Sequence, residues 1–172
     1  WKDNISLYRH TVAVTDNNFL ILNNYGTALH EQGLVDEAVQ MFRASLRIRP
    51  DHAEALYNLG RLYLLDVNSP QNALPLFTKA IAVKPDYWDA YNNLGVAYNN
   101  LGQYNETVRL LEQVSTAAGN RADFHNNLAI AYTLLGNLEA ARREMDVVRR
   151  LDPMMAQRLA VFMKSSHPAG GR

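Results

Sequence analysis

With 172 residues and 17 basic and 17 acidic side chains, the chain has no net charge to draw it to nucleic acid or to an anionic membrane surface. It contains no cysteine, which excludes disulfide bonds, thiolate metal sites and thiol catalysis. Because the sequence has no run of about 18 apolar residues, we expect no direct insertion of this segment into a membrane.

The sequence begins at Trp1 rather than at a methionine, and it shows no signal peptide. We read it as a fragment of a longer protein whose upstream part carries the targeting information. The compartment therefore stays open. The chain is cytoplasmic or, if it is tethered to an upstream membrane domain, extracytoplasmic or periplasmic.

Residues 1–16 are predicted to form the second helix of an incomplete helix pair, because Tyr8 has the same register as Phe42 in the first complete pair. This helix lacks its partner. It therefore either leaves Trp1, Ile5 and Tyr8 uncovered or packs them against the first complete pair. An uncovered face would be a contact for a homo-oligomer.

Residues 17–153 are predicted to form four repeats of two antiparallel helices, with approximate bounds 19–52, 53–87, 88–121 and 122–153. Each first helix has a small residue between two large ones: Tyr25, Gly26 and Leu29; Leu59, Gly60 and Tyr63; Leu94, Gly95 and Tyr98; Leu128, Ala129 and Tyr132. Each second helix has a small residue four positions before a large one: Ala38 and Phe42; Ala73 and Phe77; Thr107 and Leu111; Ala141 and Met145. Such spacing forms one buried stripe per helix.

Each repeat ends at a residue that does not continue a helix: Pro50, Pro85, Gly119 and Pro153. Glycines that accept positive φ are expected in the turns of the first, third and fourth repeats: Gly33, Gly102 and Gly136. One repeat cannot bury its own apolar stripe, so the repeats must stack.

The second repeat departs from this pattern, because it carries one extra residue and lacks the turn glycine. Ser69 is the expected N-cap of its second helix, with Pro70 at the first helical position. Pro75 then falls inside that helix and removes the backbone hydrogen bond to the carbonyl of Gln71, so we expect a bend or an irregular first turn there.

After the repeats, residues 154–164 are predicted to form a C-terminal capping helix that covers the last repeat, as terminal units of stacked arrays do. Residues 165–172 are predicted to be a flexible tail.

The repeated residues of 19–153 resemble the tetratricopeptide repeat (TPR) pattern. The resemblance implies an all-α fold, a right-handed superhelical TPR solenoid of antiparallel helix pairs with terminal capping helices. It also implies a non-catalytic protein-protein interaction scaffold that takes a peptide or a partner helix in its concave groove.

No catalytic, metal or cofactor site is expected. No two of the five histidines have metal-ligand spacing: His10, His30, His52, His125 and His167. No serine lies in the context of a nucleophile, and no glycine-rich phosphate loop follows a strand. At the register of His125 the other repeats have Leu22, Leu56 and Tyr91, so we expect a packing role for it rather than a catalytic one.

One asparagine recurs in the first helix of every repeat, at intervals of 34, 35 and 34 residues: Asn24, Asn58, Asn93 and Asn127. The preceding position holds another asparagine in three repeats and a tyrosine in the second: Asn23, Tyr57, Asn92 and Asn126. Stacking sets these side chains in a row, and a carboxamide pairs with both polar groups of a peptide unit. The row resembles the asparagine ladder of O-linked N-acetylglucosamine transferases. These residues, with Arg61, are therefore the candidate peptide-binding site of the concave face.

Asparagine is also common at this position among TPR sequences generally, where it hydrogen-bonds to neighbouring helices, and both roles stay open. The TPR clamp for chaperone C-termini uses a lysine and an asparagine. Here the matching positions hold Asn23 with Thr27 and Tyr57 with Arg61, so we expect no such clamp.

Two other functions stay open beside the scaffold. The stretch from Trp1 to Tyr8 resembles the segment that follows the last membrane span in polytopic glycosyltransferase-like proteins with C-terminal TPR domains. This resemblance implies an accessory domain of a membrane-bound enzyme whose activity lies outside these residues. The uncovered first helix would instead imply a self-assembly module.

Overall fold

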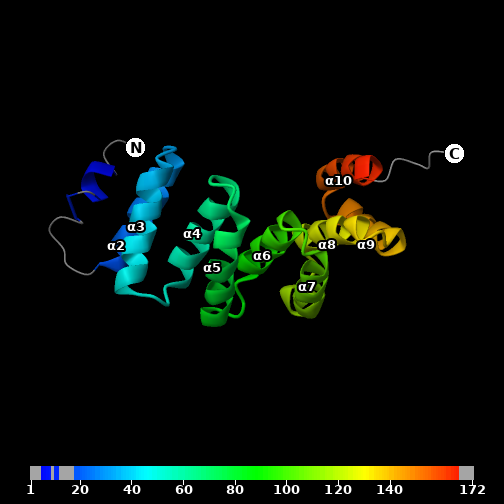
Figure 1. Ribbon diagram of the computed structural model, residues 1–172, viewed down its shortest axis with the longest axis horizontal. Helices are drawn as coiled ribbons and strands as arrows, with labels where there is room; N and C mark the ends of the chain where they lie inside the picture. Colours follow the sequence, from blue (N-terminus) through cyan, green and yellow to red (C-terminus); the bar gives the residue numbers. More distant parts are fainter. Residues whose placement is uncertain (1–4, 9, 12–17, 167–172) are drawn as a thin grey trace. The chain divides into compact units, whose positions relative to one another are not determined.

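The computed structural model describes residues 5–8, 10–11 and 18–166, all of it helices and short connections (Figure 1). The helices are α2 Phe19–Glu31, α3 Val35–Ile48, α4 Ala53–Leu65, α5 Pro70–Val83, α6 Trp88–Asn100, α7 Tyr104–Ala118, α8 Ala122–Leu134, α9 Leu138–Leu151 and α10 Pro153–Ser166. No strand occurs among the described residues, so the all-α prediction is confirmed.

The chain divides into two compact units, Trp1–Ala90 and Tyr91–Arg172, whose boundary lies inside α6. In the first unit α2 packs on α3 and α4 packs on α5, with α3 also against α4. In the second unit α8 packs on α9, and α10 covers both of them. The short connections make each of these consecutive pairs antiparallel (Figure 1). The predicted repeat bounds stay predictions.

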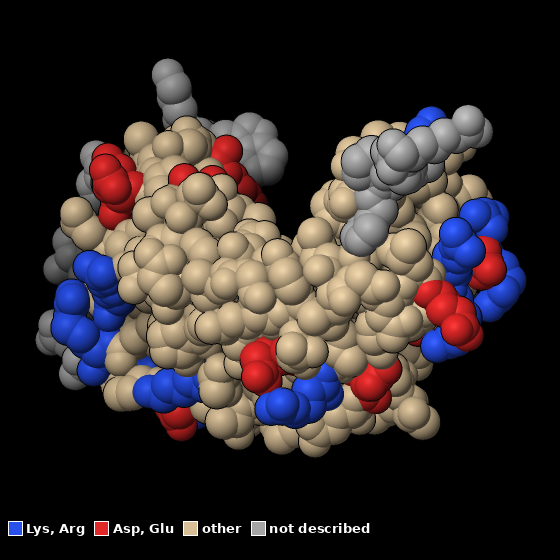
Figure 2. Space-filling view, turned by 45° about the vertical axis from the view of Figure 1, so that its right-hand side comes forward, with Lys and Arg blue, Asp and Glu red and all other residues tan. Residues whose placement is uncertain are grey.

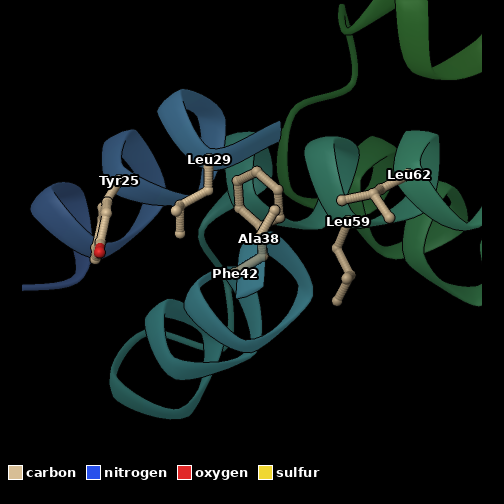
Figure 3. Close-up of a cluster of buried hydrophobic side chains, with 6 residues drawn as sticks. All are labelled: Tyr25, Leu29, Ala38, Phe42, Leu59 and Leu62. Atoms are coloured by element: carbon tan, nitrogen blue, oxygen red, sulfur yellow. The ribbon is translucent and has the colours of Figure 1, made fainter. Parts of the chain in front are cut away.

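The core of the first unit lies between α2, α3 and α4 (Figure 3). Its buried members are Tyr25, Leu29, Ala38, Phe42, Leu59 and Leu62. All of them except Leu62 are the small and large residues at helical spacing that the sequence pattern selects. Alanine at position 38 leaves room for the neighbouring helix. Burying a large side chain of this kind stabilises the fold by roughly 1.5–3 kcal/mol.

The N-terminal helix packs back on this core. Ile5 and Tyr8 lie against it, and the Tyr8 ring stacks on Tyr25 with 6.0 Å between centroids. Leu7 remains 61% exposed. Of the two arrangements left open for this helix, the structure therefore has Ile5 and Tyr8 packed on the first complete pair. Trp1 lies outside the described residues.

The turns between paired helices use left-handed backbone. The glycines expected there have φ of 77°, 73° and 77° at Gly33, Gly102 and Gly136. In the second repeat the same place, one residue before the N-cap, is taken by Asn68 with φ of 50°. Asparagine is one of the few other residues that tolerate this conformation. The extra residue therefore changes the turn without breaking the helix pair.

The second helix of that repeat starts as expected, with Ser69 as N-cap and Pro70 at the first position. The serine hydroxyl caps no backbone N–H, because it accepts a hydrogen bond from the Asn72 side chain at 2.9 Å instead. α5 continues as one helix through Pro75.

The second unit ends in α10, which starts one residue before the predicted capping helix and includes Ser165 and Ser166 of the predicted tail. Its buried Ala156 and Leu159 pack with Ala129 of α8 and Val148 of α9. Residues 167–172 of the predicted tail lie outside the described residues.

Candidate functional site

The predicted site residues come from the first helix of each pair. α2 carries Asn23 and Asn24, α4 carries Tyr57, Asn58 and Arg61, α6 carries Asn92 and Asn93, and α8 carries Asn126 and Asn127. Five of these residues lie in the first compact unit and four in the second.

The amide cluster of the first unit consists of Asn23, Asn24 and Asn58. The Asn58 Nδ2 donates to Asn23 Oδ1 at 3.2 Å, which links α4 to α2. Asn23 in turn donates to Asn24 Oδ1 at 3.4 Å. Asn23 is buried, Asn58 is half-buried and Asn24 is exposed. Asn24 and Asn58 are therefore accessible to solvent, whereas the buried Asn23 holds both of them through hydrogen bonds.

The amide cluster of the second unit consists of Asn92, Asn99 and Asn127. Asn127 donates to Asn92 Oδ1 at 2.7 Å, which repeats the bond of the first unit with the same spacing of 35 residues. Asn99 Nδ2 donates to the backbone oxygen of Asn127 at 3.2 Å, and its own Oδ1 accepts from Thr107 at 2.8 Å. Asn127 is only 5% exposed, so its side chain mainly joins α8 to α6.

These bonds give the doubled asparagines a structural role. In each case the first asparagine of one doubled position accepts a hydrogen bond from the asparagine at the second position of the next repeat. Asn23 accepts from Asn58, and Asn92 accepts from Asn127. Sequence reasoning did not find Asn99, because the other repeats have His30, Leu64 and Thr133 at that register and no pattern marks it.

An aromatic group lies beside the amides of the first unit. The Tyr57 ring lies 4.8 Å from the Tyr87 ring and 6.1 Å from that of Phe77. On the Tyr87 ring, the Lys84 ammonium lies 4.9 Å from the centroid. Burial raises the pKa of the Tyr87 hydroxyl well above its usual range, with Tyr57 and two nearby carboxylates acting in the same direction. Tyr87 is therefore a neutral phenol at physiological pH.

A chain of polar contacts in the first unit has the residue types of a hydrolase triad. Ser45 Oγ lies 3.3 Å from His52 Nδ1, and His52 Nε2 lies 3.2 Å from a Glu54 carboxylate oxygen. Burial lowers the pKa of His52, against the effect of Glu54. The hydroxyl of Ser45 is fully buried and donates to the backbone oxygen of Phe19 at 2.8 Å. It therefore holds α3 to α2 and cannot reach a substrate.

His125 does not pack as an apolar side chain. It is half-buried, and its two ring nitrogens contact Glu144 at 2.6 Å and Asn120 at 2.8 Å. These polar partners come from positions that the repeat pattern does not mark, and the expected packing role of His125 stays a prediction.

Figure 2 shows basic and acidic side chains in groups near one another on one face, with wide uncharged areas between the groups. Within residues 5–8, 10–11 and 18–166, no three His, Asp or Glu side chains come close enough to hold a metal ion. In the same part of the chain, no helix combines the length and the hydropathy needed to cross a bilayer.

The sequence matches three family models, each described as tetratricopeptide repeat, over residues 18–86, 76–109 and 101–160. The fold resembles the crystal structure of YrrB, a TPR protein with an unusual peptide-binding site, with a TM-score of 0.79 and 21% identity over 90% of this chain and 80% of YrrB. It also resembles MamA, with a TM-score of 0.80 and 22% identity over 89% of each chain.

One stretch is similar to a curated relative. The human protein O-mannosyl-transferase TMTC1 is 39% identical over 62 residues, which are 36% of this chain and 7% of that protein. The matched stretch is thus a small part of the relative. The three repeat matches together cover the helices from α2 to α9 and about the first half of α10. The chain belongs to the tetratricopeptide repeat family.

Proposed function

We propose that this chain is a non-catalytic protein-interaction module whose first helices bind an extended peptide through their asparagine carboxamides. The TPR fold is typical of protein-interaction scaffolds, and repeated helix pairs create extended binding surfaces. YrrB, whose fold is similar, is a TPR protein with an unusual peptide-binding site, which supports the proposal.

The observation that carries the proposal is a hydrogen bond between asparagine side chains, which recurs between neighbouring first helices. Asn58 uses one N–H on Asn23, and Asn127 uses one on Asn92. A carboxamide has two N–H donors and an oxygen that accepts twice. Asn58 therefore keeps its oxygen and its second N–H for a ligand, and the bond to Asn23 holds the amide in a fixed orientation. Because the side-chain amide of Asn58 is already fixed in orientation, it loses little conformational entropy when it binds a peptide backbone.

We expect the double variant Asn58→Ala/Asn93→Ala, with one amide removed in each unit, to bind peptides on an array roughly 20-fold more weakly than the wild type. Each lost hydrogen bond contributes ~1 kcal/mol, or about a fivefold change in affinity. Because the contact is to the peptide backbone, the loss should be similar for peptides of different sequence.

The matched control is Asn105→Ala, which removes an exposed carboxamide from α7, a second helix. Since Asn58→Ala also removes the hydrogen bond between α4 and α2, the exposed Asn24→Ala serves as a second test that keeps that bond and loses only the 3.4 Å contact from Asn23. Binding that survives in the double variant while the fold is intact would contradict the proposal.

A second candidate function is an accessory TPR domain of a membrane-bound glycosyltransferase-like enzyme. The similarity of 62 residues to protein O-mannosyl-transferase TMTC1 favours it. We expect the reading frame upstream of Trp1 to encode several apolar segments of about 20 residues each. Sequencing the gene upstream checks this, and an upstream region without such segments would exclude the candidate.

A further inference from the structure

A groove lies between α9 and α10, which pack on each other in the second unit (Figure 1). Its volume is about 360 Å³, too small for a whole helix with a diameter of roughly 10 Å but large enough for side chains of a ligand. None of its lining residues belongs to the amide clusters. These residues are Arg142, Met145, Asp146, Arg149, Ala160 and Met163.

The apolar part of the α9–α10 groove is a core position that the last helix pair leaves open. At the register of Met145, the first three repeats have side chains that are at most 2% exposed: Phe42, Phe77 and Leu111. Met145 is only partly buried, as are Ala160 and Met163 on the facing helix. Alanine fills little of the space, and methionine side chains adapt to partners of different shape. The groove can therefore take apolar side chains from another molecule.

The charged part of the groove has one cation that no carboxylate balances. Asp146 pairs with Arg149 at 2.6 Å, and Glu139, one turn before Arg142, pairs with Arg143 at 2.6 Å. Within the part of the chain that the structure describes, Arg142 makes no ion pair or hydrogen bond. Its side chain is exposed, so it is available to a carboxylate of a ligand.

The opposite side of the groove adds a second cation. Lys164 follows Ala160 by one turn of α10, so the two share one face of that helix. Lys164 is exposed, and no described carboxylate pairs with it. An apolar groove between two unbalanced cations is complementary to a ligand that combines apolar and acidic side chains.

Segments of this chain fit the groove less well than such a ligand does. Residues 167–172, which follow α10 in the sequence, contain no acidic side chain. A second copy that docked through the same face would place Arg142 and Lys164 of both copies against each other, because a two-fold contact uses the same patch twice. The charge of the groove therefore favours a different, acidic partner.

We propose that the α9–α10 groove binds a short acidic amphipathic helix of a partner protein. Apolar side chains one turn apart on that helix contact Met145 and Met163, as in other complexes of a helix in an apolar groove. Acidic side chains beside them pair with Arg142 and Lys164, and the arginine donates charge-assisted hydrogen bonds. Since the groove shares no residue with the amide clusters, this inference goes beyond the proposed function.

The test uses a library of displayed peptides of about 16 residues, long enough for partial helicity. Apolar residues occupy one face at helical spacing, and the flanking positions vary among Glu, Gln and Lys. We expect selection on the wild-type protein to enrich glutamate at the flanking positions. The best acidic peptide should bind roughly tenfold more tightly than its glutamine counterpart, and this ratio should fall as salt is added.

Two variants locate the binding. Arg142→Glu should remove the preference for the acidic peptide, whereas the matched control Arg143→Glu changes the next residue of α9, which does not line the groove, and should keep it. Ala160→Met fills the groove and should weaken binding of both peptides about tenfold. Circular dichroism checks that each variant folds, and Arg142→Gln replaces Arg142→Glu if the latter does not.

Three results would overturn the proposal. The first is a library without enrichment of acidic sequences. The second is an equal effect of Arg142→Glu and Arg143→Glu on the selected peptide. The third is self-association of the wild type in sedimentation experiments that Ala160→Met abolishes, because a second copy of the chain would then be the occupant.

Discussion

Replacing Gly60 by alanine is expected to destabilise the protein by about 1–2 kcal/mol, although alanine is the better helix former. A Cβ atom at this position would lie 2.8 Å from Cε1 of Phe77 and 3.1 Å from two more ring atoms. Phe77 is fully buried, so its ring has nowhere to move. The strain of overpacking, roughly 1–3 kcal/mol, therefore exceeds the propensity gain of up to ~1 kcal/mol.

The same change at Gly95 is the matched control, because the residue opposite is a leucine. There the new Cβ would lie 3.1 Å from Cδ1 of Leu111, and a few tenths of an ångström of movement relieve it. We expect Gly95→Ala to be neutral or stabilising by up to ~1 kcal/mol. In the fourth repeat Ala129 already holds this position, with Met145 packed nearby.

Urea denaturation followed by circular dichroism measures both variants. A Gly60→Ala variant as stable as Gly95→Ala would refute the steric argument. The double variant Gly60→Ala/Phe77→Leu should recover part of the loss, because leucine at position 77 copies the third repeat.

Phe77→Ala is expected to cost about 3–5 kcal/mol, the largest effect of the changes proposed, because it opens a cavity where no solvent reaches. The ring is fully buried, contacts Gly60 and lies 6.1 Å from the Tyr57 ring. Since total stability is about 5–15 kcal/mol, this loss is a large share of it. Phe77→Leu should cost much less, because Leu111 fills the equivalent position in the third repeat.

Hydrogen exchange of the backbone amides of α4 and α5 checks this prediction, with faster exchange expected in Phe77→Ala. The control is Leu65→Ala on α4, where the side chain is 63% exposed and the effect should stay within about 0.5 kcal/mol. An alanine variant at position 77 with wild-type exchange would show that the core of α4 and α5 does not depend on this ring.

Local signals predicted most of the helix pairs. The small and large residues recur at helical spacing, and the breakers Pro50, Pro85 and Gly119 fall between helices. Periodicity alone therefore placed all the buried residues of the core around Phe42 except Leu62. Even the irregular second turn carried a local signal, because Asn68 stands where the other repeats have glycine and tolerates the same backbone conformation. Such features depend on residues a few positions apart.

The tertiary structure decided which side chains far apart in the sequence form hydrogen bonds with one another. The row of asparagines was visible in the sequence, but their bonds join residues 35 positions apart, and pairing of Asn58 with Asn23 follows from the stacking of α4 on α2. Asn99 forms hydrogen bonds with Asn127 and Thr107, although no repeated asparagine marks its position in the sequence.

Arg61 is the clearest case of this difference. The sequence placed it one turn after Tyr57 on the first helix of the second repeat. Whether a cation is compensated depends on which carboxylates the fold brings within reach and how much water it removes. Spacing along the chain determines neither of these, and the tertiary structure leaves this guanidinium half-buried with no carboxylate among the described residues within ion-pair distance.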